Sequence, residues 1–238
     1  MKILFIHQNF PGQYKHLVPA LAAKGHQVVA LTPKVQKPVK WHTVTILPYE
    51  IKGQSTPGIQ PWIADFETKL LRGASCYRAA LDLKRKGFEP DVILAHHGWG
   101  ESMFLKDVWP KARMGLYCEL YHVTSETFVA FDPEFQRPSP ELDPLRIRMK
   151  NLNNRLHEEI MDAGISPTRF QANTFPPEWR DRITVAHDGI DTDVVRPNPD
   201  ATLEEAQAGC GGNLCRCGTY VGMNQALMDA AKSLKGGV

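Results

Sequence analysis

The chain has 238 residues, 42% of them hydrophobic, which is enough for a folded core and argues against wholesale disorder. Its net charge of +2 is spread along the sequence, which argues against nucleic acid as a partner, and its five cysteines are too few for a disulfide-rich secreted scaffold. The apolar start is too short for a membrane span and carries no signal-peptide cleavage pattern. We therefore expect a cytoplasmic protein, with a peripheral position at the inner face of the membrane as the alternative.

The first third of the chain begins with a repeating unit of strand, turn, helix and strand. Lys2 to His7 is a continuous apolar run, typical of a strand buried on both faces. Helical spacing of apolar residues follows from Tyr14 to Ala22 and stops at Gly25, and His26 to Leu31 reads as a second strand. Such a unit in a parallel sheet forms a right-handed crossover.

The same alternation continues to about residue 196. The predicted strands are 41–47, 91–95, 113–118 and 182–186, and the predicted helices are 62–81 and 145–163, with Gly87 and Gly164 as their stops. This order predicts an α/β domain with a doubly wound, mostly parallel, Rossmann-like sheet, whose ligands lie beyond the carboxyl ends of the strands.

The character of the sequence changes after Arg196. We divide the chain into a domain at 1–196 and a short α-helical hairpin tail at 197–238, joined by the Pro-rich turn 197–200. Thr202 to Glu205 has the spacing of a capping box and predicts a helix start. A turn rich in Gly and Cys follows, and apolar residues from Met223 to Leu234 then predict a second helix.

Four short motifs occur in order over the first 196 residues. They are Phe10-Pro11-Gly12-Gln13-Tyr14-Lys15-His16-Leu17, Phe131-Asp132-Pro133-Glu134-Phe135, Ile165-Ser166-Pro167-Thr168-Arg169 and His187-Asp188-Gly189-Ile190-Asp191-Thr192-Asp193. In this combination the segment resembles the amino-terminal domain of family 4 retaining glycosyltransferases. The resemblance implies one half of a GT-B fold, the acceptor-side half, in an enzyme that moves a sugar from a nucleotide sugar to an acceptor hydroxyl. It implies a nucleotide sugar as co-substrate and no firm cofactor.

Glycine and hydroxyl residues at turns are the candidate phosphate contacts. Gly12, with Gln13 beside it, follows the first strand, where a missing Cβ lets backbone N–H groups approach a diphosphate. A plain turn glycine is the alternative. Ser166, Thr168 and Arg169 lie at a strand-to-helix turn, where hydroxyls and a guanidinium can meet phosphate. For Ser166 the favoured alternative is a helix N-cap ahead of Pro167.

The candidate catalytic residues follow the predicted fourth and fifth strands. They are His96 and His97 after the strand at 91–95, and Glu119 and His122 after the strand at 113–118. A histidine at this edge can hydrogen-bond the transferred sugar or assist proton movement. Loop packing is an equally good reading of each one taken singly.

The tail carries a second resemblance. Gly212-Asn213-Leu214-Cys215-Arg216-Cys217-Gly218-Thr219-Tyr220 resembles the end of the 2Fe–2S small subunit of the xanthine and carbon-monoxide dehydrogenase families. That family uses Cys-x-Cys for two of four thiolates and an upstream Cys-x-x-Cys, which this sequence lacks, for the others. Cys215 and Cys217, with Cys210 as a third thiolate, are the candidate metal ligands, while Cys76 and Cys118 read as buried apolar residues.

A GT-B site lies between two lobes, and the sequence beyond Asp193 shows neither a second Rossmann-like series nor a Glu-x7-Glu pair. We therefore expect little or no transfer by the isolated chain, because both reactants must be held together. Self-association, or association with a donor-domain partner, is the expected way to cover the open face. Two alternatives remain open, a 2Fe–2S electron-transfer module and a non-functional fusion or truncation product.

Overall fold

The computed structural model describes residues 1–124, 134, 139–194, 198, 200, 202–205 and 220–236. It divides the chain into two compact units, Met1–Asp188 and Gly189–Val238. The motif at 131–135, apart from Glu134, and all three tail cysteines lie outside the described residues.

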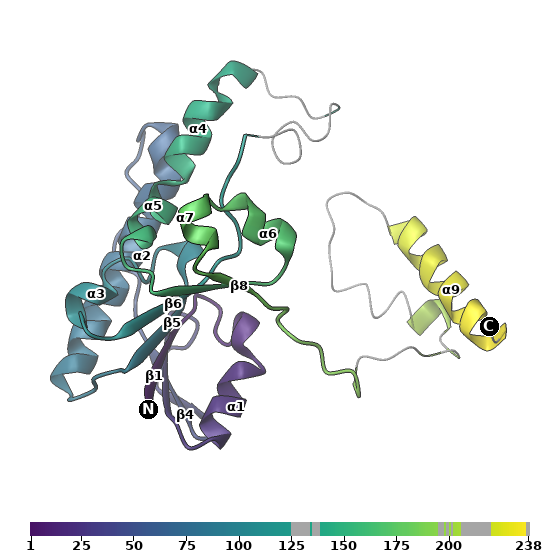
Figure 1. Cartoon of the computed structure of the whole chain (residues 1–238), viewed down its shortest axis with the longest axis horizontal. Helices are drawn as coiled ribbons and strands as arrows, with labels where there is room; N and C mark the ends of the chain where they lie inside the picture. Colours follow the sequence, from purple (N-terminus) through teal and green to yellow (C-terminus); the bar gives the residue numbers. More distant parts are fainter. Residues whose placement is uncertain are drawn as a thin grey trace. The chain divides into compact units, whose positions relative to one another are not determined.

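The first unit is built on one sheet of eight strands in the order β3-β4-β2-β1-β5-β6-β7-β8 (Figure 1). All neighbours are parallel except β3 and β4. The chain runs outward from β1 through β2 to β4, and then returns to place β5 on the other side of β1. The strands are β1 (Lys2–Ile6), β2 (Gln27–Thr32), β3 (Val39–Trp41), β4 (Val44–Pro48), β5 (Val92–His96), β6 (Arg113–Tyr117), β7 (Ala163–Ser166) and β8 (Ile183–Val185).

Helices connect the strands and cover the sheet (Figure 1). The α-helices of the first unit are α1 (Leu17–Ala23), α2 (Pro61–Arg85), α3 (Leu105–Val108), α4 (Asp143–Lys150), α5 (Leu152–Glu158), α6 (Arg169–Thr174) and α7 (Pro177–Arg180). Three short 3-10 helices, η1 (Gly12–Tyr14), η2 (His97–Trp99) and η4 (Pro140–Leu142), lie in the connections. The predicted doubly wound, mostly parallel α/β fold is confirmed.

The sheet is buried on both faces, as the apolar run at the start of the chain predicts. Leu4 and Ile6 join a cluster that includes residues of α2 and α3, whereas Ile3 and Phe5 join a cluster that includes Val18 of α1. Successive strand residues point to opposite faces, so the continuous run supplies both cores. The carboxyl ends of β1 and β5 meet where the strand order reverses, which is the edge where α/β sheets bind ligands.

Two predicted elements differ from the structure. The single strand expected at 41–47 is an antiparallel hairpin of β3 and β4, with the left-handed residue His42 (φ 52°) between them. The single helix expected at 145–163 is α4 followed by α5, and Ala163 and Gly164 belong to β7. Gly164 is needed in β7 because a Cβ there would lie 2.9 Å from Cys118 Sγ.

The second unit contains the tail elements. The backbone N–H of Thr202 donates to Glu205 Oε2 (2.8 Å), and that of Glu205 donates to Thr202 Oγ1 (3.2 Å), so the predicted capping box is confirmed. The predicted second helix is α9 (Tyr220–Gly236). The first unit ends at Asp188, whereas the sequence places the domain boundary at 196.

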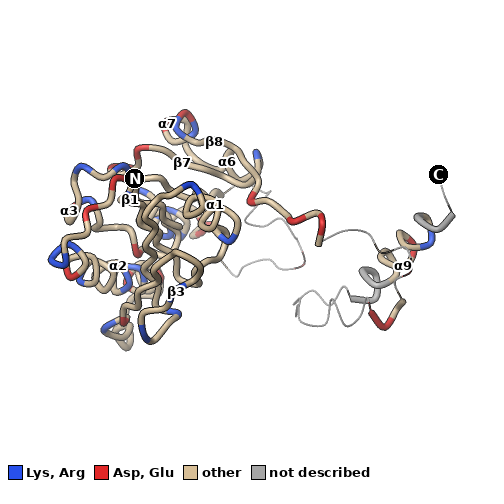
Figure 2. Tube along the Cα trace, turned by 90° about the horizontal axis from the view of Figure 1, so that it is seen from below, with Lys and Arg blue, Asp and Glu red and all other residues tan. Residues whose placement is uncertain are grey.

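Charges of both signs are interspersed along the trace of the first unit (Figure 2). Among the described residues, no helix combines the length and the apolar character needed to cross a bilayer.

Candidate active site

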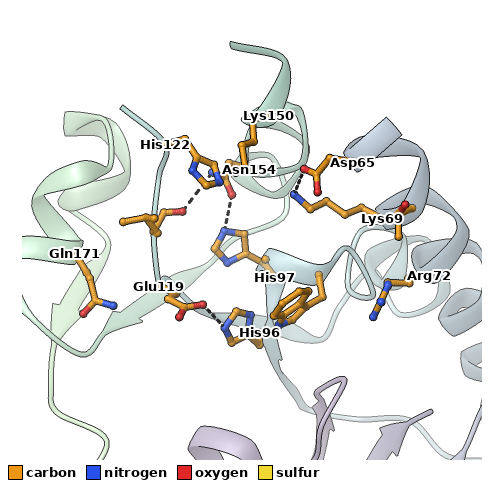
Figure 3. A pocket seen from close by; sticks show the side chains of 14 residues that line it. Asp65, Lys69, Arg72, His96, His97, Glu119, His122, Lys150, Asn154 and Gln171 are labelled. Carbon is orange, nitrogen blue, oxygen red and sulfur yellow. Dashed lines mark hydrogen bonds and ion pairs between the residues drawn. The ribbon is translucent and has the colours of Figure 1, made fainter. Parts of the chain in front are cut away.

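A cavity of about 460 Å³ opens at the carboxyl edge of the sheet, beside the ends of β5 and β6 (Figure 3). α2 forms one wall, η2 and the segment after β6 form the floor, and α4, α5 and α6 each contribute a side chain. The lining residues are Asp65, Thr68, Lys69, Arg72, His96, His97, Gly98, Trp99, Glu119, Leu120, His122, Lys150, Asn154 and Gln171. The four catalytic candidates from the sequence are all among them.

His96 and Glu119 form a hydrogen-bonded pair in this cavity. His96 ends β5, and its Nε2–H donates to Glu119 Oε2 at 3.0 Å. This bond is the main cause that lowers the pKa of Glu119, so the carboxylate is anionic at neutral pH. The side chain of His96 is 2% exposed and that of Glu119 is 49% exposed. The charge of Glu119 is therefore exposed to the cavity, and the buried His96 fixes the position of the carboxylate through this hydrogen bond.

The imidazole of His96 is fixed on its other sides by aromatic rings. It stacks on Tyr117 with centroids 5.2 Å apart, and the ring of His7 meets it edge-on at 5.5 Å. The Tyr117 hydroxyl donates to both carboxylate oxygens of Asp188 at 2.9 Å. Burial is the main cause that raises the pKa of Tyr117, so the phenol keeps its proton for this bond. His96 Nδ1 is buried and has no hydrogen-bond partner within the described part of the chain.

His7, at the end of β1, is a site residue that the sequence analysis missed because it reads as the last residue of a strand. Its Nδ1 accepts from the Asn9 backbone N–H (2.9 Å), and its Nε2–H donates to Gln13 Oε1 (2.7 Å). These bonds fix one neutral tautomer, and burial is the main cause that lowers the pKa of His7. Gly12 has φ 50°, and a Cβ on it would lie 2.3 Å from the His7 ring.

Gly12 and Gln13 therefore have a local role in holding His7. Neither residue lines the cavity of Figure 3. A diphosphate contact by either residue stays a prediction.

His97 lies deeper than His96 and is 1% exposed. Its Nδ1 lies 2.9 Å from the Tyr117 carbonyl oxygen, and its Nε2 lies 2.9 Å from Asn154 Oδ1. Burial holds the pKa of His97 well below its usual value. His97 thus joins η2 to β6 and α5, and one edge of it reaches the cavity.

His122 is held through its backbone. Its N–H donates to Asn151 Oδ1 (3.0 Å), and its carbonyl oxygen accepts from Asn151 Nδ2 (2.7 Å). Burial, with smaller contributions from the positive charges of Lys150 and Lys69, lowers the pKa of His122 to about 4. The imidazole is therefore neutral at physiological pH.

Four lining residues come from α2 at positions 65, 68, 69 and 72, and the sequence analysis did not identify them. Their spacing is that of one helix face, which is the signal that was available. Arg72 is the most constrained of the four because its guanidinium bonds Gln8 and lies 3.6 Å from the buried carboxylate of Glu101.

The turn at 166–169 has its own structural roles. Thr168, and not Ser166, caps α6, because its Oγ1 accepts from the Gln171 backbone N–H (3.2 Å) and its backbone is extended as an N-cap requires. Ser166 is fully buried at the end of β7. Ser166, Thr168 and Arg169 do not line the cavity, although Gln171 does, and their phosphate contacts stay predictions.

The predicted metal ligands Cys210, Cys215 and Cys217 are not described, so a 2Fe–2S cluster stays a prediction. Cys76 and Cys118 are free and buried, as predicted. In the ranges that the structure describes, no three His, Cys, Asp or Glu side chains are grouped to hold a metal ion.

Comparison with known proteins yields one family. The model described as "Glycosyl transferase family 4 group" matches residues 24–195, which is more than half of the chain. A search of the curated proteins found no match.

Several solved structures align with this chain. Os79 from O. sativa, in complex with UDP and deoxynivalenol-3-glucoside, is 11% identical with a TM-score of 0.51, over 93% of this chain and 57% of that one. The catalytic domain of starch synthase IV from Arabidopsis thaliana, bound to ADP and acarbose, is 14% identical with a TM-score of 0.48, over 89% and 58%. Sucrose-phosphate synthase from Thermosynechococcus elongatus is 15% identical with a TM-score of 0.47, over 91% and 98%. The chain thus spans less than two thirds of the length of the starch synthase domain and of Os79.

Proposed function

Since the chain belongs to the glycosyl transferase family 4 group, we propose that it acts in the transfer of a sugar from a nucleotide-sugar donor to an acceptor hydroxyl. The proposal assigns the unit Met1–Asp188 to the acceptor-binding lobe. The observation that supports it is the cavity at the carboxyl edge of the sheet, whose lining includes the hydrogen-bonded pair His96 and Glu119. Both residues lie within the range 24–195 that the family model matches.

Glu119 is the residue we assign to the acceptor. Its carboxylate is anionic and half exposed in the cavity, so it can accept a hydrogen bond from a sugar hydroxyl. His96 is a positioning residue because its reactive nitrogen Nδ1 is buried, whereas its Nε2–H orients Glu119. Polarising the acceptor O–H in this way makes its oxygen a better nucleophile toward the sugar carbon, whose bond to the diphosphate breaks.

We further propose that transfer needs a second lobe that binds the donor. Developing negative charge on the leaving diphosphate must meet preorganised donors, and the two reactants must be aligned. Under this proposal the 238-residue chain alone binds acceptor and releases nucleoside diphosphate no faster than buffer. Turnover well above the buffer rate by the pure chain would contradict the two-lobe requirement.

The experiment compares Glu119→Gln with Glu89→Gln, an exposed carboxylate that is absent from the cavity lining. Transfer of labelled sugar from a panel of UDP-, GDP- and ADP-sugars is measured for each protein, with and without a separately produced donor lobe of the same family. We expect lobe-dependent transfer that falls at least about tenfold in Glu119→Gln and is unchanged in Glu89→Gln. Equal transfer by both variants would remove Glu119 from the site, and no transfer under any condition would contradict the function.

A further inference from the structure

Arg72 projects from α2 into the cavity and is held in place before any ligand binds (Figure 3). Its Nη1 donates to Oε1 of Gln8, a residue that follows β1. The same Nη1 lies 3.6 Å from Oε1 of Glu101, a residue that follows η2. Tyr49 supports Glu101 from the other side, because its hydroxyl donates to the same carboxylate oxygen at 3.3 Å. Three connections of the sheet therefore fix the position of one guanidinium.

Much of the hydrogen-bonding capacity of Arg72 is left over. A guanidinium carries five N–H donors in a planar fork, and only those on Nη1 have a partner among the described residues. The side chain is 21% exposed, at the cavity. Donors on Nε and Nη2 are thus available to a bidentate acceptor such as a carboxylate or a phosphate.

The guanidinium lies over the indole ring of Trp99 and covers part of that face. The Arg72 carbon Cζ is 5.9 Å from the ring centroid of Trp99, and Trp99 is 41% exposed at the cavity. The part of the indole that the guanidinium leaves exposed offers an apolar surface for one part of a ligand, and the guanidinium offers a charge for another.

The cavity is lined by three cations, Lys69, Arg72 and Lys150, and by two carboxylates, Asp65 and Glu119, so its formal charge is +1. Lys69 is paired with Asp65 at 2.7 Å, but Lys150 forms no ion pair with a described residue. The carboxylate beside Arg72, Glu101, is buried, and burial is the main cause that raises its pKa.

We propose that Arg72 is a specificity-determining residue that binds an anionic substituent, a carboxylate or a phosphate, on a sugar acceptor whose ring lies against Trp99. This inference rests on the proposed function, because the acceptor is the substrate assigned to this lobe. It makes a uronic acid or a sugar phosphate the expected acceptor class and disfavours a neutral sugar.

The test is isothermal titration calorimetry of the full chain with glucuronate, glucose 6-phosphate, glucose and UDP. We expect at least one charged sugar to bind about tenfold or more tightly than glucose, and the tighter of the two identifies the anion. Arg72→Gln should remove that preference, whereas Arg85→Gln, an exposed arginine of the same helix, should leave it unchanged. Equal binding of charged and neutral sugars, or binding of none of them, overturns the proposal.

Glu101→Gln provides a variant that keeps Arg72 and removes a buried carboxylate. Because the guanidinium then loses its competing charge, binding of the charged sugar should tighten severalfold. If Arg72 served only as the structural partner of Glu101, affinity for the charged sugar would not change, and the proposal would fail even where Arg72→Gln does not fold.

UDP separates the acceptor from the donor. A loss of UDP affinity in Arg72→Gln, with sugar binding intact, would assign the guanidinium to the donor diphosphate and overturn the proposal. Measurements of sugar binding and of sugar transfer also distinguish the failure of one proposal from the failure of the other. A charge preference without any transfer contradicts the proposed function alone, and transfer without a charge preference contradicts the role of Arg72 alone.

Discussion

At the scale of single residues, the contact between Gly12 and His7 couples a backbone conformation to the orientation of an imidazole. Alanine at position 12 would adopt φ 50° and place its Cβ 2.3 Å from the ring of His7, which must then leave Gln13. Gly25 (φ 81°) is a matched control because a Cβ there meets nothing within 4 Å.

We expect Gly25→Ala to lower the free energy of unfolding by about 1–2 kcal/mol, the usual cost of a left-handed residue. Gly12→Ala should cost at least ~1 kcal/mol more because it adds overpacking. Urea unfolding measures both values, and equal losses in the two variants would show that the ring of His7 yields without cost.

His157 makes stability depend on pH. It is fully buried, its Nδ1–H donates to the Asn153 carbonyl oxygen, and its Nε2 accepts from Ser102 Oγ (2.8 Å). Burial lowers its pKa to about 4. Because the unfolded chain binds this proton near pH 6.5, the stabilisation is complete above pH 6.5 and is lost as the pH falls toward 4.

Between pH 6.5 and pH 5, the loss from His157 alone should be about 1.6 kcal/mol. His157→Gln should remove that part of the pH dependence, whereas replacement of the exposed His16 should not. Urea unfolding at the two pH values checks this. If the free energy of unfolding of His157→Gln fell by as much between the two pH values as that of the original protein, the buried ring would accept the proton in the folded state.

At the scale of elements, α6 depends on the residue that precedes it, Thr168. Thr168 caps this six-residue helix with its hydroxyl, and the helix delivers Gln171 to the cavity. Thr168→Ala should cost about 1 kcal/mol, and Thr168→Ser should restore most of it because serine keeps the hydroxyl. Thermal unfolding of the two variants decides this, and equal melting temperatures would remove the cap from the account of α6.

Elements with a regular apolar pattern could be predicted from the sequence, and those set by tertiary contacts could not. The run from Lys2 to Ile6 predicts β1 because both faces of that strand are apolar. Gly164 looks like the stop of a helix, but its role is to let β7 pass close to Cys118 and β8, which no local pattern reveals.

At the scale of the whole molecule, the compact unit Met1–Asp188 contains the entire sheet and the cavity. We expect a fragment of residues 1–188 to fold alone, with a melting temperature within about 3 °C of that of the full chain, a difference of roughly 1 kcal/mol. Circular dichroism and thermal unfolding test this. A fragment that fails to fold would show that residues after 188 contribute to the core.

The same scale explains how much of the site could be predicted. His96, His97, Glu119 and His122 follow predicted strands, and the parallel sheet brings the ends of those strands to one edge, where all four line the cavity. Their catalytic role stays a prediction. Arg72 lies on a helix whose polar face reads as solvent-exposed in a sequence. Only the packing of α2 beside η2 turns that face toward the cavity.

The bond between Tyr117 and Asp188 also connects the last residue of the first unit to the aromatic rings around His96. Asp188 is the last residue of that unit, and the phenol that donates a hydrogen bond to it is also the ring that stacks on the imidazole of His96. A displacement of Asp188 would therefore change the position of the Tyr117 ring and, through the stacked rings, that of the imidazole that orients Glu119.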